Sequence, residues 1–277
     1  MENLLFSRVV EVVVGGTDVS ALEVEFEVEA DLAPGPDTAT LRIFNASADT
    51  RGAIHGYPKH SPVRIKAGYK NSVPLIFSGE LRRVFTAREE GDIITTVECG
   101  AGDTARSLTR RLDKSYGSGS NVSVVLNDLL SACGLGKGNL PTILSRVDFE
   151  GVSKQFFDGL VCSGPAWDQL RDILDHSGYD CTVQNGALVA VLRQGAAEGT
   201  AVLLTSETGL VGSPSVDKSG VLTCETLMVP DIFPGRKIQV QSEFVNGTFT
   251  VSRCAYSGSL FGSEFGIAIE TKKKTTT

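Results

Sequence analysis

The stretch LEVEFEVEA, residues 22–30, alternates strictly between apolar and acidic side chains. Successive side chains of a β-strand point to opposite faces, so the pattern predicts a strand with one apolar and one acidic face. The acidic face carries four carboxylates, those of Glu23, Glu25, Glu27 and Glu29. We expect the apolar face to cover a core, while the acidic face meets solvent, a water-filled passage or another chain.

The rest of the first hundred residues repeats the strand pattern. Further strands are expected at 6–14, 38–45, 61–69, 73–89 and 92–99. One short helix is predicted over 47–56, because its first residue, Ser, is a good N-cap. Short strands at this spacing favour a barrel or a sandwich, and a closed barrel also removes exposed strand edges.

The pattern becomes helical after residue 102. Residues 103–112 can form a helix, and VSVVLNDLLSAC at 122–133 places its apolar side chains on one stripe. Gly134 stands where a helix C-cap is expected. A third helix is predicted over 165–178, with Trp167 on its apolar stripe as a core residue.

Strand patterns then return. Two hairpins are predicted around Asn185-Gly186 and Asn246-Gly247, since Asn-Gly is a strong turn signal between strands. The outline is mainly β (α+β), with two antiparallel β modules around a small helical insert. The predicted divisions are an N-terminal β module at 1–102, a helix-containing middle region at 103–178 and a C-terminal β module at 179–277.

Composition limits the function classes. The net charge is −7, and the first hundred residues carry 15 acidic against 10 basic residues. This balance argues against a surface that grips nucleic acid, although nucleic acid could pass such a surface without sticking. No apolar run reaches the roughly 18–20 residues needed to cross a bilayer, and the N-terminus does not resemble a signal peptide. The six scattered cysteines form no metal-binding pattern and suggest reduced thiols; three disulfides are the alternative.

No catalytic, cofactor or metal site is predicted. His176 follows Asp172 by one helical turn, but no nucleophile motif accompanies them. His55 and His60 are expected in a surface loop, because two histidines alone do not hold a metal. The glycine-rich residues 134–138 follow a helix, so they suit a cap better than a phosphate-binding loop. The acidic stripe lacks the converging loop geometry of a calcium site.

Four stretches follow one another in a recognisable order. They are ATLRIFNASADTRGAI at 39–54, VRIKAGYKNSVPLIFSGELRRVFTAREEGDIITTVECGAG at 63–102, PAWDQLRDILDHSGYDCTVQNGALVAV at 165–191 and LVGSPSVDKSGVLTCETLMVPDIFPGRKIQVQSEFVNGTFTVSRCAYSGS at 210–259. This order resembles the baseplate hub, or tail hub, proteins of long-tailed bacteriophages and related contractile injection machines.

The resemblance implies two tail-tube-like β-barrel modules per chain and a homotrimer whose six modules form a pseudo-hexameric ring. It implies a structural virion component of the tail tip, assembled in the host cytoplasm, and neither an enzyme nor a cofactor-binding protein. Such a ring joins the tail tube or distal tail protein above to the central spike protein below. Its channel passes the tape-measure protein and then DNA during genome ejection, without specific DNA binding and without membrane insertion.

The resemblance also suggests a role for the acidic strand. Glu23, Glu25, Glu27 and Glu29 could line the channel, where carboxylates repel phosphate and keep DNA from adhering. The alternative places them on the outer surface or at an interface, paired with Arg64, Arg82 or Arg83 of a neighbour. Two other functions stay open: a distal tail or other tail-tip ring protein, which a hexamer would favour, and a tail-associated hydrolase.

Overall fold

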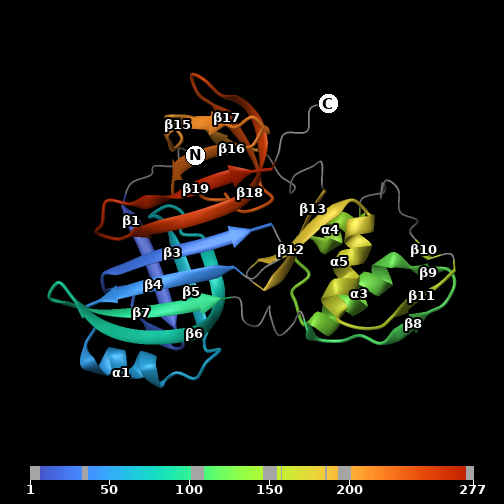
Figure 1. Cartoon of the computed structure of the whole chain (residues 1–277), viewed down its shortest axis with the longest axis horizontal. Coiled ribbons are helices and arrows are strands. Elements are labelled where there is room, and N and C mark those ends of the chain that lie inside the picture. Colours follow the sequence, from blue (N-terminus) through green and yellow to red (C-terminus); the bar gives the residue numbers. More distant parts are fainter. Residues whose placement is uncertain are drawn as a thin grey trace. The chain divides into compact units, whose positions relative to one another are not determined.

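The computed structural model describes residues 7–32, 37–100, 109–145, 155–156, 158–184, 186–192 and 201–272. The chain divides into two compact units (Figure 1). The strand unit comprises residues 1–32, 37–102 and 198–277, and the helical unit comprises residues 33–36 and 103–197. In the described part of the chain, no helix is both long and apolar enough to cross a membrane.

The strand unit is built on one large sheet, antiparallel apart from the β14–β17 pair. Its ladder runs in the order β15-β16-β19-β18-β3-β4-β7-β6-β5-β1-β2, and β17 and β14 extend from β18. The N-terminal strands are β1 (Arg8–Val14), β2 (Thr17–Asp18), β3 (Val24–Asp31), β4 (Thr38–Phe44), β5 (Pro62–Tyr69), β6 (Leu75–Glu89) and β7 (Asp92–Gly100). The C-terminal strands are β14 (Val202–Leu204), β15 (Leu210–Val216), β16 (Leu222–Leu227), β17 (Lys237–Gln241), β18 (Asn246–Ser259) and β19 (Phe265–Thr271).

The pairing of β3 with β18 joins the two ends of the chain into this sheet. Figure 1 shows the blue β3 beside the red β18, and the register pairs Val28 with Tyr256. Side chains from both halves then share one core. Phe26 from β3 packs edge-on against Phe265 from β19, with ring centroids 6.1 Å apart.

The short helix α1 (Ala48–Gly56) connects β4 to β5. The Ser47 side chain caps it by accepting a hydrogen bond from the Thr50 N–H at 3.1 Å. Ile54 anchors the helix to the core of the strand unit. The predicted helix is therefore confirmed together with its cap.

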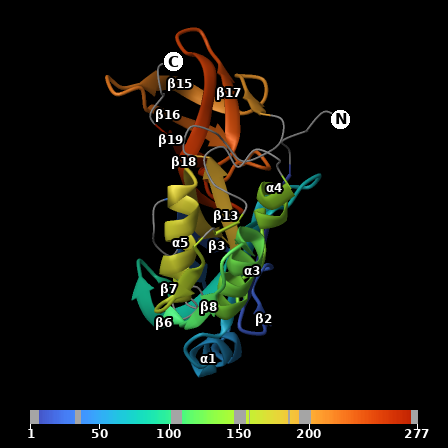
Figure 2. The same ribbon diagram turned by 90° about the vertical axis from the view of Figure 1, so that its right-hand side faces the viewer.

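The helical unit has a core of its own. Its elements are α3 (Val122–Cys133), α4 (Leu140–Ser145), α5 (Ala166–His176), the hairpin β12 (Tyr179–Gln184) and β13 (Ala187–Leu192), and the short pairs β8 (Lys114–Tyr116) with β11 (Leu160–Cys162) and β9 (Ser120–Asn121) with β10 (Gln155–Phe156). Helices α3 and α5 pack side by side, as Figure 2 shows. The predicted core role of Trp167 is confirmed, and Gly134 caps α3 in the left-handed conformation.

The mainly β class is confirmed, but the two barrels are not. Among the described strands the ladder ends at β15 and β2, and no sheet closes on itself. Hydrogen bonds between β3 and β18 join the expected N- and C-terminal modules into one sheet instead. The hairpin β12–β13 lies in the helical unit, while the expected boundary at 178 had placed it with the C-terminal strands.

One predicted turn lies a few residues too late. Asn246 and Gly247 do not form the turn of the β17–β18 hairpin; they already pair with Gln241 and Val240 in the ladder. The turn runs over residues 242–245, where the Val245 N–H donates to Ser242 Oγ at 3.0 Å. The serine hydroxyl closes this turn locally, so the Asn-Gly pair is not needed there. Most of the helix predicted at 103–112 lies outside the described residues.

The six cysteines are all free and buried. Burial raises the pKa of the Cys99 and Cys181 thiols to about 12 and that of Cys133 and Cys224 to about 11. These side chains therefore act as small apolar residues, as expected for reduced thiols.

Candidate functional site: the acidic face of β3

The alternation along β3 appears in the structure as predicted. Val24, Phe26 and Val28 are buried in the core of the strand unit. Glu27 and Glu29 are exposed, Glu25 is half-buried, and Glu23 is exposed directly before the strand begins. The four carboxylates therefore share the outer face of a central strand of the sheet.

Two arginines on neighbouring strands neutralise part of this face. Arg42 on β4 stands opposite Glu25 in the register and binds it at 2.9 Å, and its second nitrogen binds Glu89 on β6 at 2.8 Å. Arg253 on β18 binds Glu29 at 3.0 Å. Arg42 thus links strands β3, β4 and β6, while Arg253 links the N- and C-terminal halves of the sheet.

The side chains of Glu23 and Glu27 are exposed. Within the described residues, neither carboxylate has an ion pair or a hydrogen bond. Arg83 reaches Glu98 at 3.9 Å, and the Arg82 guanidinium lies against the backbone of Gly100. Among the described residues, the arginines that contact the stripe are therefore Arg42 and Arg253.

The histidines singled out in the sequence do not converge. His55 Nε2 lies 2.9 Å from Thr86 Oγ1, and His176 Nδ1 lies 2.6 Å from the backbone oxygen of Asp172. His60 Nδ1 lies 2.7 Å from Glu80 Oε2, which sequence reasoning missed because the two residues lie on different segments. In the part of the chain that the structure describes, no cluster of three or more His, Cys, Asp or Glu side chains could hold a metal ion.

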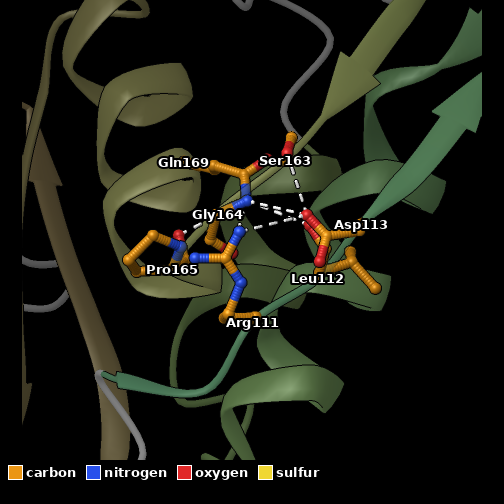
Figure 3. A network of polar contacts seen from close by, with 7 residues as sticks. All are labelled: Arg111, Leu112, Asp113, Ser163, Gly164, Pro165 and Gln169. Atoms are coloured by element: carbon orange, nitrogen blue, oxygen red, sulfur yellow. Dashed lines mark hydrogen bonds and ion pairs between the residues drawn. The ribbon is translucent and has the colours of Figure 1, made fainter.

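A second polar cluster in the helical unit also went unpredicted (Figure 3). Asp113 accepts hydrogen bonds from Ser163 Oγ at 2.9 Å and from the Gly164 N–H at 3.1 Å, and it faces Arg111 at 3.5 Å. These contacts, the Ser163 hydrogen bond above all, lower the pKa of the Asp113 carboxyl. They hold the connection between β11 and α5 in one conformation.

A family model described as Baseplate hub gp41 matches residues 38–270 of this chain. The 43 kDa tail protein of prophage MuSo2 from Shewanella oneidensis has a similar structure, with a TM-score of 0.65, 10% identity, and coverage of 97% of this chain and 99% of that chain. A tail protein from Neisseria meningitidis MC58 gives a TM-score of 0.63 at 11% identity, with 97% of both chains covered. Similarity at such low identity shows a common fold.

The fold also extends to a secretion machine. The c3393 protein of E. coli, a type VI secretion component described as similar to the phage T4 tail proteins gp27 and gp5, gives a TM-score of 0.52 at 10% identity. The match covers 91% of this chain and 74% of that one. No curated protein matches the chain by sequence.

Proposed function

Because the chain belongs to the baseplate hub gp41 family, we propose that it is the tail hub of a phage-like particle, in which three copies form a ring around a central channel. The family match carries this proposal, since residues 38–270 run from β4 almost to the end of β19. The ring is a structural component of the tail tip with no catalytic step. It joins the tail tube or distal tail protein above to the central spike below.

The large sheet supports this role. Strands β1–β7 and β14–β19 join edge to edge through β3 and β18, so one chain supplies two groups of strands in one continuous sheet. Three copies would supply six such groups, the number that a six-fold tail tube requires. The ring would then continue the tube wall and enclose the path of the tape-measure protein and DNA.

The outer face of β3 is our candidate for the channel wall. Glu23 and Glu27 carry unpaired negative charge, which repels phosphate over distances up to about one Debye length, roughly 8 Å at physiological salt. Arg42 and Arg253 hold Glu25 and Glu29 in fixed positions and limit repulsion along the stripe. This arrangement suits DNA that must pass without adhering. In the alternative orientation the same face contacts a neighbouring chain.

The mass of the purified particle tests the proposal. We expect light scattering or native mass spectrometry to give three chains, and electron images to show a ring with a central hole. Images at side-chain resolution should place Glu23 and Glu27 on the channel wall. A six-chain ring would instead indicate a distal tail protein, and a protein that remains monomeric at all concentrations contradicts self-assembly. Glutamates on the outside of the ring would rule out the channel role alone.

A further inference from the structure

The helical unit carries an apolar hollow of about 350 Å³ on its surface. One wall is β11, through Leu160, Val161 and Cys162, and the other is the second half of α5. Val161 is 73% exposed, the largest value among the exposed aliphatic side chains of the described residues. An aliphatic side chain held this far out in water is a candidate contact for another molecule.

The hollow runs along a strand edge. Neighbouring side chains of a strand point to opposite faces, yet all three residues of β11 line the hollow. The hollow therefore follows the edge of the strand and not one of its faces. β8 occupies the other edge, and no further strand of the described chain pairs with β11. Such an edge presents backbone N–H and C=O groups to an added strand.

The cluster of Figure 3 holds the two walls together at one end of the hollow. Gln169, which lines the hollow, donates from Nε2 to the backbone oxygens of Leu112 at 3.2 Å and Gly164 at 3.0 Å. Asp113 fixes Ser163 and Gly164 directly after β11. The spacing of strand and helix is therefore set before any ligand arrives, which lowers the entropy lost on binding.

Charge at the rim of the hollow selects the ligand. Asp172 is among the residues that line the hollow, and its carboxylate makes no hydrogen bond or ion pair with another described side chain. Asp168, one turn earlier on α5, is instead engaged by Arg171 at 3.8 Å. An unpaired carboxylate beside an apolar hollow favours a ligand with a cationic group next to an aliphatic one.

We propose that this groove, defined by β11 and the second half of α5, binds an extended segment of a partner protein. The segment adds as a strand to the free edge of β11, places an aliphatic side chain in the hollow and sets a Lys or Arg against Asp172. The helical unit thereby becomes a docking module for another component. This role goes beyond ring formation and does not involve β3, so either proposal can fail without the other.

A labelled heptapeptide of sequence TKVKVKT tests the groove on the full-length protein. Fluorescence anisotropy should show saturable binding, and hydrogen–deuterium exchange should slow at residues 158–164. Asp172→Asn should weaken binding by about 3- to 10-fold and reduce its salt dependence. Val161→Lys should weaken it at least 10-fold, and this variant should fold because Val161 is exposed.

Asp168→Asn is the matched control, since it removes the same charge from the same helix outside the hollow and should leave binding within 2-fold. The peptide TEVEVET should not bind. The proposal is overturned if TKVKVKT does not bind at millimolar concentration, if slowed exchange appears elsewhere, or if Asp172→Asn and Asp168→Asn behave alike.

Discussion

At the scale of the residue, single charged side chains are positioned by strands that are distant in the sequence. Arg42 connects Glu25 to Glu89, and its guanidinium also stacks 5.4 Å from the ring centre of Phe44. These pairs are 40–49% exposed, so each contributes at most about 1 kcal/mol to stability. Their main effect is to fix the positions of the Glu25 and Glu89 carboxylates on the sheet.

Asp37, just before β4, gives a prediction at this scale. Burial raises the pKa of its carboxyl from 3.8 to about 7. The folded state thus binds the Asp37 proton more tightly than the unfolded chain does. The contribution of this proton to the free energy of unfolding is therefore full below about pH 4 and is lost as the pH rises to about 7. We expect Asp37→Asn to raise the free energy of unfolding at pH 8 by roughly 1–3 kcal/mol, with less gain at pH 4. Urea unfolding at both pH values measures this.

The exposed substitution Glu27→Gln serves as the control and should leave the difference between the two pH values unchanged. A loss of stability at pH 8 in Asp37→Asn would show that the ionised carboxylate stabilises the fold.

At the scale of the element, local signals decide where helices and turns begin. Ser47 caps α1, and Asn121 caps α3 by accepting from the Ser123 N–H at 2.9 Å. The first N–H groups of a helix lack partners within it, so a side-chain oxygen at the cap removes a free-energy cost. In the turn of the β17–β18 hairpin, Ser242 Oγ likewise accepts a hydrogen bond from a backbone N–H, that of Val245.

Ser47→Ala tests the cap of α1. We expect the free energy of unfolding of the strand unit to fall by about 1 kcal/mol, because the Thr50 N–H loses its acceptor. Ser47→Asp keeps an acceptor and should restore most of that stability. Thermal or urea unfolding followed by circular dichroism compares the two variants. Equal losses in both would mean that the cap hydrogen bond contributes nothing.

At the scale of the whole molecule, the chain contains two separate cores. One lies in the strand unit and includes Leu41, and the other lies in the helical unit and includes Leu129. Both side chains are completely buried. Each unit therefore has its own source of hydrophobic stabilisation, even though the helical unit is inserted between two parts of the strand unit.

This division predicts that the units unfold separately. Leu129→Ala should remove about 2–5 kcal/mol from the helical unit and lower only one of two calorimetric transitions. Leu41→Ala, the matched control, should lower the other. If either substitution moves both transitions together, the two units unfold as one cooperative structure.

The alternation of side chains along the sequence predicts the acidic face of β3, but not the ion pairs on it. Which side chains of β3 share a face follows from the alternation at residues 22–30. The partners of Glu25 and Glu29 do not, because Arg42 and Arg253 reach them through strand pairing. The groove beside β11 was also invisible in the sequence, since its walls are a three-residue strand and a helix that the sequence places in the core.

The sequence by itself determined most strands of the first hundred residues, the short helix α1 and its cap, the apolar stripes of α3 and α5, and the order of segments that marks the family. Each of these depends on residues a few positions apart, where side-chain period and capping chemistry act directly. Only the tertiary structure decided that β18 pairs with β3, more than two hundred residues earlier, and that β12 and β13 pack with helices. Many strands of similar pattern could have paired with β3, and only packing of the complete core selects among them.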